Sequence, residues 1–561
     1  PAAVWEAVPI LATLPRAKLQ ATRAALKAEL GGALNLNNFD AAIREAREEA
    51  RNARRATSRT DEGRPVVLLG RQLRDTARDS MQALLQANVP PQLFVRAAKL
   101  ARVVRDEKGR PVIGDVGVDE LRNILKTAAN FVRFTKNGEV DCDPPEVIAR
   151  DILAEGEWVF PGLEGVVEVP TLRPNGSVIA APGYDPETML FFAPPADAEA
   201  IPKVPTAPTG EDVLAAVALL EELTCDFPFT SEPDRANFIG LLLTPFVRPA
   251  IDGCVPLAII DAPQAGTGKS LLAEIVALLG TGRKAALLAA PRDDDEMRKR
   301  LTAILRAGST FVVFDNVEVP LEFPSLALAL TAHVWQDRVL GMSDNVILPQ
   351  RATWAVTGNN VTLRGDMPRR TYVIHLDAEQ ARPWLRNTDA FRHPDLLKWV
   401  SAHRGPLVGA LLTLARAWFA AGKPNTNAPV IGGFAEWSQT VGGILTNAGI
   451  PGFLGNLNEL YDAMDDEGQQ WRAFLEAWEE CFGQTAVTTA ELVAGMVSDT
   501  GPTTLREALP DAAFDRNGIP DARRLGHLLR RKERVRVGDP PRWLVKAGNA
   551  RRAMLWALRT P

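Results

Sequence analysis

Cysteine and histidine are scarce in this chain, and their scarcity excludes two classes of small fold, those held together by zinc and those held together by disulfides. The 561 residues contain four cysteines and five histidines, and the cysteines lie far apart with no CxxC pair. A zinc knuckle or a disulfide scaffold requires closely spaced cysteine or histidine side chains, so neither is indicated. The cysteine usage suits a reducing compartment, and we predict a cytoplasmic protein.

Long apolar runs are also absent from the sequence. No stretch approaches the roughly 18 uncharged apolar residues that span a bilayer, and the N-terminus has no basic-then-apolar leader pattern, so we expect no membrane partner. The formal net charge of −5 argues against a chain that coats nucleic acid along its whole length. The composition does provide 46% hydrophobic and 24% charged residues, which is typical of globular proteins with packed cores.

The length predicts several folding units, because single hydrophobic cores stop growing beyond about 250–300 residues. A cluster of prolines between positions 194 and 208 marks a linker, since proline continues neither a helix nor a central strand. We predict a helical N-terminal region, a mixed α/β domain ending in this linker, an α/β core, a helical connector and a C-terminal domain, at residues 1–110, 111–205, 206–400, 401–465 and 466–561.

Local patterns give further expectations for the chain before the core. Residues 60–110 read as mostly helical. Two hairpins are expected after them, and two helices then lead into the core. The expected hairpin arms are 131–134 with 139–140 and 166–169 with 177–180, and the expected helices are 211–223 and 233–243.

A short apolar strand, a glycine-rich loop and a helix follow one another at 257–279. Residues 257–260 suit a buried parallel strand, and 271–279 carry apolar residues at helical spacing. The loop between them reads DAPQAGTGKS, and its two glycines allow backbone N–H groups to point inward at phosphates. We expect Lys269 to contact the β and γ phosphates of ATP and Ser270 to ligate Mg²⁺. The predicted nucleotide-binding residues are Pro263, Gln264, Ala265, Gly266, Thr267, Gly268, Lys269, Ser270 and Leu271; Pro263 stands where the pattern GxxxxGK[ST] has glycine.

A second strand ends in an acid about 45 residues downstream of the loop. Residues 310–314 are followed by Asp315, which is expected to hold Mg²⁺ together with Ser270. A catalytic acid commonly comes next, but position 316 is asparagine. The hydrolysis base therefore stays open between Glu318, acting on the attacking water, and Asn316, orienting it.

Two further segments complete the predicted catalytic set. A third strand, 353–357, is followed by Asn359 and Asn360, one of which is expected to hydrogen-bond the γ-phosphate, because parallel sheets place ligand groups at the carboxyl ends of their strands. Arg369 and Arg370 precede a fourth strand, 372–376. A ring ATPase takes an arginine from the neighbouring subunit, worth about 10³ to 10⁵ in rate. We predict this role for one of the two arginines, and hence an oligomer.

The order of these motifs resembles the AAA+ and superfamily 3 helicase cores. AxxxGTGKS, FVVFDN, TGNN and DMPRR occur in that order between about 251 and 378. The similarity is nearest to replication helicases, often fused to primases, of phages, plasmids and integrative elements. It implies a hexameric ring that uses ATP to pull single-stranded or forked DNA through a central pore. It also raises a primase as a candidate partner, although this chain offers no convincing pair of strand-borne acids for primase activity.

A hairpin is expected just before TGNN, similar to the pore hairpin of that family. Residues 338–341 and 346–348 flank its tip, and the predicted DNA contacts are Arg338 at the base and Met342 at the tip. Family members often carry lysine, histidine or an aromatic residue at the tip, and this chain has Met-Ser-Asp-Asn there. A simple surface hairpin therefore stays open as the alternative.

The C-terminal region resembles a winged helix and is strongly basic. Helices are expected at 471–482, from a cap at Thr488, and at 521–534, and strands at 543–546 and 553–558 around a turn at 548–549. Residues 521–561 carry twelve Arg or Lys against three acids. Such an excess predicts contacts to the DNA backbone, with a solvated basic tail as the alternative. The predicted contacts are Arg523, Arg524, Arg530, Arg531, Lys532 and Arg534.

Together these patterns predict a multidomain α/β protein. Its parts are a helical and mixed α/β N-terminal region, a P-loop AAA+ core and a C-terminal winged-helix domain. The expected function is that of an ATP-hydrolysing DNA helicase in the replication of a phage or other mobile genetic element. Two alternatives stay open: an AAA+ replication initiator or DNA-remodelling ATPase without processive unwinding, and a nucleotide-binding DNA scaffold, which Asn316 in place of an acid favours.

Overall fold

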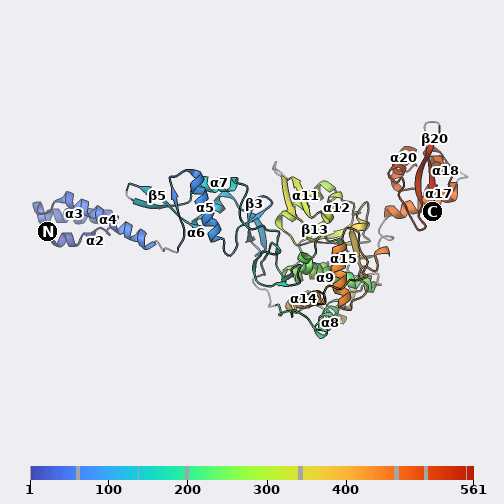
Figure 1. Ribbon diagram of the computed structural model, residues 1–561, viewed down its shortest axis with the longest axis horizontal. Coiled ribbons are helices and arrows are strands. Elements are labelled where there is room, and N and C mark those ends of the chain that lie inside the picture. Colours follow the sequence, from blue (N-terminus) through green and yellow to red (C-terminus); the bar gives the residue numbers. More distant parts are fainter. Residues whose placement is uncertain are drawn as a thin grey trace. The chain divides into compact units, whose positions relative to one another are not determined.

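The structure is a mixed α/β, multidomain one (Figure 1). Its internal contacts divide it into two compact units. The computed structural model describes residues 2–58, 63–136, 138–195, 201–338, 345–459, 466–497, 503–550 and 553–561. The first unit comprises Pro1–Ala87 and Val118–Ile152, and the second comprises Asn88–Gly117 and Leu153–Pro561. The second unit contains every residue of the predicted site.

The first unit combines a helical segment with a small sheet. The helical segment has its own apolar contacts among Val8, Ala12, Phe39 and Ile43. Its helices are α1 (Ala2–Glu6), α2 (Val8–Leu11), α3 (Arg16–Leu30) and α4 (Leu36–Ser58). In the sheet, β1 (Val66–Leu69) pairs in parallel with β5 (Asn130–Thr135), which pairs antiparallel with β6 (Gly138–Cys142) and so confirms the first predicted hairpin. The accompanying helices are α5 (Leu73–Ala87), α6 (Val118–Ala128) and α7 (Glu146–Ala154).

One expectation for residues 60–110 and one for the second hairpin are wrong. Residues 60–110 are not mostly helical, because they contain β1, β2 (Phe94–Arg96) and β3 (Lys99–Arg105). β3 pairs antiparallel with β4 (Pro111–Asp115). Ala97 and Ala98 have φ values of 52° and 56°, so alanines that favour a helix locally form the tight turn between β2 and β3 instead.

The second predicted hairpin has its turn in the right place but one wrong arm. β8 (Thr171–Leu172) pairs with β9 (Val178–Ile179), whereas β7 (Gly165–Val167) pairs in parallel with β11 (Leu190–Phe192). β11 also pairs antiparallel with β10 (Gly183–Asp185). Tertiary packing decides between these partners, because each short apolar segment suits either pairing.

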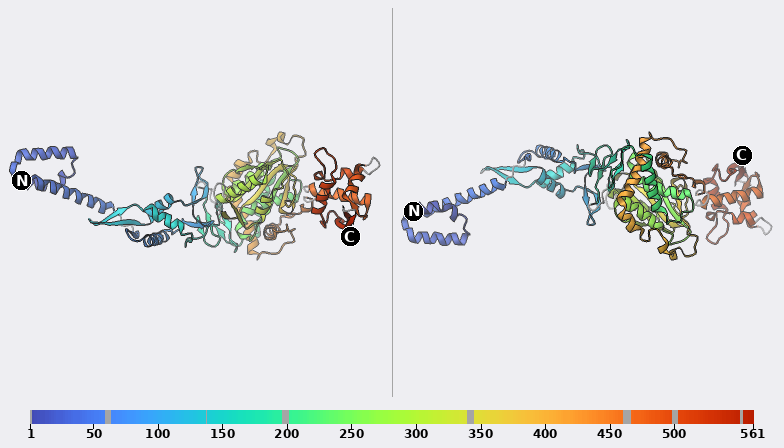
Figure 2. Two further views of the ribbon diagram at one scale, coloured as in Figure 1. Left: turned by 90° about the horizontal axis from the view of Figure 1, so that it is seen from above. Right: turned by 90° about the horizontal axis from the view of Figure 1, so that it is seen from below.

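A five-stranded parallel sheet forms the core of the second unit (Figures 1 and 2). Its strand order is β13-β14-β17-β12-β18, and every neighbouring pair is parallel. The strands are β12 (Leu257–Ala262), β13 (Leu287–Ala289), β14 (Phe311–Val317), β17 (Thr353–Asn359) and β18 (Thr371–His375). The four predicted strands are thus confirmed, and β13 was not predicted. The carboxyl ends of all five strands lie along one edge.

Helices surround this sheet and supply most of the remaining core. α10 packs against β12, β14 and β17, and α9 packs against β18. The two helices predicted at 211–223 and 233–243 are confirmed as α8 and α9. The helices are α8 (Gly210–Thr224), α9 (Glu232–Val247), α10 (Lys269–Thr281), α11 (Asp294–Ala307), α12 (Pro324–Thr331), α13 (Leu396–Ala402), α14 (Arg404–Ala420) and α15 (Ala435–Asn447). No helix of the described residues is both long enough and apolar enough to cross a bilayer.

A hairpin is present before TGNN, but its first arm precedes the predicted one: the two overlap at Arg338, and positions 339–341 of the predicted arm lie outside the described residues. β15 (Val334–Arg338) pairs antiparallel with β16 (Asn345–Pro349). Trp335 and Leu348 are buried, and the indole N–H of Trp335 donates to Thr302 Oγ1 of α11 at 2.9 Å. The base of the hairpin is therefore tied to the core. Met342 and the rest of the predicted tip lie outside the described residues.

The last part of the chain has a hydrophobic core of its own. Its sheet has the order β19-β21-β20, and its helices include the three that were predicted. The elements are α17 (Asp466–Phe482), β19 (Val487–Thr488), α18 (Thr489–Val497), α19 (Thr503–Glu507), α20 (Ala522–Arg531), β20 (Trp543–Ala550) and β21 (Ala553–Arg559).

Two details of this region differ from the prediction. The third helix ends at Arg531, three residues before the predicted end at Arg534, where φ is 62° and the backbone is no longer helical. The expected turn at 548–549 is wrong, since β20 continues to Ala550. Gly548 instead lies where the pairing of β20 with β21 is irregular, between Lys546 and Asn549.

A buried polar network ties α9 to the sheet. Asn237 is fully buried; its Oδ1 accepts from the N–H of Leu454 at 2.8 Å, and its Nδ2 donates to Val373 O at 2.8 Å and to Asn456 Oδ1 at 3.0 Å. Asn456 in turn donates to Asp234 at 2.8 Å. Every member of the network has a partner, so the network specifies how α9 docks.

We predict that Asn237→Leu lowers the free energy of unfolding by about 2–4 kcal/mol, because the N–H of Leu454 and the carbonyl of Val373 lose their partner in a dry environment. Chemical denaturation measures the change. The control is Asn425→Ala at an exposed position, which should stay within about 0.5 kcal/mol of wild type. Equal stability of the two variants would contradict a structural role for the network.

Candidate functional site

The predicted site residues gather at the carboxyl edge of the five-stranded sheet. Lys269 Nζ donates to Asn359 Oδ1 at 2.7 Å and to Gln264 O at 2.9 Å. Ser270 Oγ donates to Asp315 Oδ1 at 2.8 Å. These contacts join segments that are 45 and 90 residues apart in the sequence.

A bulge in β14 aims Asp315 at the serine. The register shifts between Phe314 and Val317, and Asn316 has φ of 53°. The hydroxyl of Thr357 on β17 fills the bulge, donating to Asp315 Oδ1 at 2.6 Å and accepting from the N–H of Asn316 at 2.9 Å. Bulges commonly re-aim side chains beside active sites. Thr357 was not predicted as a site residue, although it ends an apolar strand and begins the TGNN motif.

The loop between β12 and α10 presents its backbone toward the same edge. Gly266 and Gly268 have φ of 80° and 106°, which other residues rarely adopt. No side chain caps α10, so its first N–H groups are available to an anion, and the helix dipole favours negative charge there. Lys269 is only 8% exposed, and burial lowers its pKa while Asp261 and Asp315 oppose that shift. The loop therefore favours a polyanionic ligand.

A histidine and an aspartate that were not predicted form the base of the site. Asp261 at the end of β12 lies 3.5 Å from Nδ1 of His375 at the end of β18. Its other carboxylate oxygen accepts from the N–H of Val361 at 3.1 Å. The hydrogen bond to Asp261 raises the pKa of His375, which favours a protonated imidazole.

The two open candidates for the hydrolysis base contact each other. Asn316 Nδ2 donates to Glu318 Oε1 at 3.0 Å, and both side chains are exposed. Asn360 does not join this group through its side chain; its backbone N–H donates to Ala262 O at 3.2 Å and its φ is 49°. Of the two neighbouring asparagines, Asn359 is the one that contacts Lys269.

A loop segment after β18 packs against the loop between β12 and α10, and it was not predicted from the sequence to belong to the site. A Cβ at Gly266 would lie 2.9 Å from the backbone nitrogen of Trp384. Arg386 Nη2 donates to Thr267 O at 3.2 Å, and the guanidinium lies 5.1 Å from the ring centroid of Phe391. Burial lowers the pKa of Arg386. In the sequence, Trp384 and Arg386 were the residues that could have indicated this contact.

The two candidate arginines lie at the opposite edge of the sheet. They belong to the turn Pro368–Arg370, directly before β18, and Thr371 pairs with Leu257, the first residue of β12. The phosphate-loop end of β12 is five residues further on, or about 17 Å at the usual rise per residue. Neither arginine therefore belongs to the phosphate-loop cluster of its own chain.

Their environments differ. The side chain of Arg370 is 15% exposed and is held by Asp366 and by Thr331 Oγ1 at 2.6 Å. The side chain of Arg369 is 71% exposed, and within the described part of the chain its ion pair is with Asp366. Its guanidinium is the principal cause that lowers the pKa of Asp366. Arg369 is thus the more accessible cation.

The donor set suits a nucleotide with magnesium. Lysine, uncapped helix N–H groups and glycine-rich backbone match phosphate oxygens. Ser270 and Asp315 offer two oxygen ligands on adjacent elements, and Mg²⁺ is usually bound by few protein oxygens plus water and phosphate. Within the described ranges, no group of three or more His, Cys, Asp or Glu has metal-binding geometry, so a closed all-protein metal cage is not indicated.

The predicted DNA-binding residues form two separate sets. Arg338 is exposed at the last position of β15. On α20 the apolar residues Leu525 and Leu529 face inward, whereas the basic ones are largely exposed. Arg523, Arg524, Arg530, Arg531 and Arg534 are exposed, and Lys532 is half-buried with Nζ 5.6 Å from the centroid of Trp471.

Comparison with known proteins gives distant similarities. No protein-family model and no curated protein matches the chain. A crystal structure of JCV helicase with a bound small molecule is similar at 15% identity and a TM-score of 0.24, over 47% of this chain and 64% of that one. SCCmec type IV Cch, an active helicase, is similar at 12% identity and a TM-score of 0.28, over 72% of this chain and 78% of that one. Both of these solved structures are of helicases.

We predict that the contribution of His375 to stability decreases as pH rises. Its folded-state pKa is raised above the ordinary value, so the stabilisation by Asp261 is fully present below about pH 6.5 and is lost as pH rises through the folded-state pKa. His375→Gln should cost at most about 1 kcal/mol at pH 6, because solvent partly screens the pair, and less at pH 9. Denaturation curves at both pH values measure this. In an Asp261→Asn background most of the pH dependence should be lost, because Asp234 and Asp377 make smaller contributions to the raised pKa of His375. An unchanged pH dependence would assign it to another group.

Proposed function

We propose that this chain is an ATP-dependent DNA helicase of a phage or other mobile genetic element, acting in replication as a ring-shaped AAA+ motor. One observation carries the proposal. Lys269 meets Asn359, and Ser270 meets Asp315, at the carboxyl edge of one parallel sheet. A random glycine-rich turn has no reason to bring these groups together.

Each residue of this cluster has a proposed role in hydrolysis. Lys269 and the N-terminus of α10 bind the β and γ phosphates, and Ser270 and Asp315 hold Mg²⁺. When bound, ATP·Mg²⁺ supplies the phosphoryl group that is transferred to water. Glu318 accepts the proton of the attacking water, with its carboxylate oriented by Asn316, and Asn359 orients the γ-phosphate.

We assign the trans-acting arginine to Arg369 and a structural role to Arg370. An arginine that reaches a neighbouring subunit must be exposed, as Arg369 is, whereas the side chain of Arg370 is largely buried against Asp366 and Thr331. Because this edge lies opposite the phosphate loop, a ring, proposed as a hexamer, would bring each Arg369 to the next subunit's site.

We predict that Lys269→Ala abolishes DNA-stimulated ATP hydrolysis and that Arg369→Ala lowers its rate by a factor of about 10³ or more. Mixing the two variants should restore part of the turnover. Wherever the phosphate loop of an Arg369→Ala subunit meets Arg369 of a Lys269→Ala subunit, the shared site keeps both groups. Lys299→Ala, an exposed change on α11, is the control and should hydrolyse ATP normally. No restoration on mixing would contradict shared sites, and no turnover by wild type would leave a nucleotide-binding DNA scaffold.

We further propose that the C-terminal domain is a winged helix that binds the DNA backbone through α20. The outward face of α20 presents arginines, and the domain has a separate core to hold the helix in place. Arginine and lysine contacts to phosphate add affinity without selecting sequence.

We predict that the double variant Arg530→Ala, Arg531→Ala weakens DNA binding and reduces the slope of log affinity against log salt by about one to two units. Fluorescence anisotropy at several salt concentrations measures both effects. Arg506→Ala with Arg516→Ala removes two exposed arginines of the same domain outside α20, and it should leave the slope closer to wild type. Equal losses in both double variants would indicate a diffuse basic surface.

Strand displacement separates the helicase from its nearest alternative. A ring that hydrolyses ATP and binds DNA but does not separate a forked duplex would be a replication initiator or remodelling ATPase. Adding a primase in trans then tests the proposed partner, because a functional contact should change either DNA binding or ATP turnover.

A further inference from the structure

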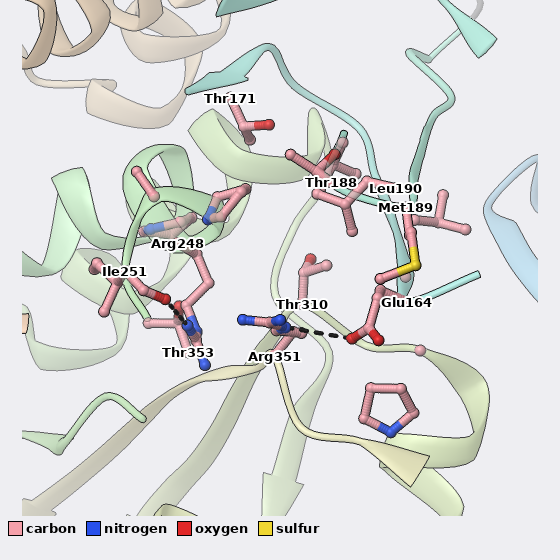
Figure 3. Close-up of a pocket in the computed structure, with 18 of the residues that line it drawn as sticks. Glu164, Thr171, Thr188, Met189, Leu190, Arg248, Ile251, Thr310, Arg351 and Thr353 are labelled. Atoms are coloured by element: carbon pink, nitrogen blue, oxygen red, sulfur yellow. Dashed lines mark hydrogen bonds and ion pairs between the residues drawn. The ribbon is translucent and has the colours of Figure 1, made fainter. Parts of the chain in front are cut away.

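A cavity of about 390 Å³ lies at the amino-terminal edge of the parallel sheet. Thr310, directly before β14, and Thr353, the first residue of β17, belong to its wall. The phosphate-loop cluster lies at the other ends of the same strands. Figure 3 shows Arg248, Ile251 and Thr353 on one side of the cavity and Thr188, Met189 and Leu190 on the other.

Arg248 is a buried cation in this wall without a carboxylate partner. Its side chain is 5% exposed, Nη1 donates to Ile251 O at 3.2 Å, and Nη2 donates to Gln350 O at 3.3 Å. No carboxylate of the described residues forms an ion pair with it; Arg351 repels it, and Asp252 attracts it without direct contact. Burial lowers the pKa of Arg248 to about 10. Buried charges are normally paired, so this guanidinium favours an anion.

The neighbouring charges do not neutralise Arg248. Glu164 is engaged by Arg351 at 3.4 Å, and Glu168 is engaged by Arg283. Arg96, 6% exposed, donates to the main-chain carbonyls of Leu305 and Arg306 at the end of α11. Two further acids of the wall, Asp252 and Glu187, form no ion pair with Arg248 within the described part of the chain, so its guanidinium has no direct carboxylate partner.

Four buried polar atoms of the wall have no hydrogen-bond partner among the described residues. They are Nε of Arg96, Nε of Arg248, Oγ1 of Thr171 and Oγ1 of Thr353. Most buried polar atoms in folded proteins have a partner, so four such atoms around one cavity point to a polar ligand. The volume is within the range of small-molecule pockets.

The rest of the wall limits the shape of the ligand. Val166, Val169, Leu190 and Ile251 give it an aliphatic character, and none of the described residues that line it is aromatic. A nucleobase would find no ring to stack on, whereas a short aliphatic body would be well packed.

We propose that this cavity binds a small organic anion, with a carboxylate or phosphate head paired to Arg248 and a compact aliphatic body against the valines and Leu190. The hydroxyls of Thr171 and Thr353 donate to the head group. The site is separate from the phosphate loop, and its occupancy does not depend on the function proposed above.

Calorimetric titration of the full chain with hexanoate, hexyl phosphate and hexanol tests the proposal. At least one of the two anions should bind with one site per chain and roughly tenfold more tightly than the alcohol, because the alcohol cannot pair with the guanidinium. The two anions distinguish a carboxylate head from a phosphate head. Lys269→Ala should bind the anion as wild type does, which excludes the phosphate loop. Failure of both anions to bind, or equal binding of hexanol, overturns the proposal.

Isosteric variants assign the binding to this cavity. Thr171→Val should keep or raise the melting temperature, because it removes a hydroxyl without a partner, and should weaken anion binding about threefold to tenfold. Arg248→Met should remove the preference for the anion over hexanol. The control is Thr413→Val on α14, which loses a hydrogen bond to Gly409 O and should lower the melting temperature without affecting binding. If Arg248→Met does not fold, Thr171→Val decides, and unchanged anion binding in Thr171→Val overturns the proposal.

Discussion

The hydrogen bonds that converge on Asp315 hold three distant parts of the chain in one place. Its Oδ1 accepts from Ser270 at the start of α10 and from Thr357 at the end of β17. This geometry requires parallel strands in the observed register, since a slip of one residue would turn each side chain to the other face. The bulge at Asn316 then supplies the last adjustment, because it turns the carboxylate toward the serine.

The length of the parallel strands also keeps two groups of polar and charged residues apart. One edge collects the lysine, serine, aspartate and asparagine that suit phosphates and magnesium. The other edge carries Arg369 and the cavity with Arg248. Charged groups at opposite ends of the same strands do not meet within one chain, so an arginine at the far edge can serve a phosphate site only in another subunit. A ligand in the cavity would likewise leave the phosphate edge free.

Buried arginines recur in this core, and their partners differ. Arg404 donates to the carbonyls of Leu278 and Leu279 near the end of α10, and Arg96 does the same at the end of α11. In both cases the negative end of a helix dipole compensates the cation. Arg248 meets two loop carbonyls instead, with no helix end to compensate its charge. That contrast is why Arg248, and not the other two, indicates an anionic ligand.

Much of the fold could be predicted from local sequence, and the missed parts have physical reasons. The apolar runs before Asp261, Asp315 and Asn359 have few alternatives to buried strands, and glycines before Lys269 require a loop. Segments of mixed preference were harder: Ala97 and Ala98 favour a helix locally, yet the pairing of β2 with β3 makes them a turn. The segment 165–167 found a partner in 190–192 that no local pattern indicates.

The sequence by itself determined which residue types stand at the ends of the core strands, because hydrophobic periodicity and glycine placement act over a few residues. Tertiary structure alone decided which of them meet. Asn359 rather than Asn360 contacts Lys269, and Arg369 rather than Arg370 is exposed. Thr357 joins the site although no role was predicted for it, and His375 and Arg386 join from segments with no local motif. Each of these outcomes depends on strand register and burial, which arise only when segments tens of residues apart pack together.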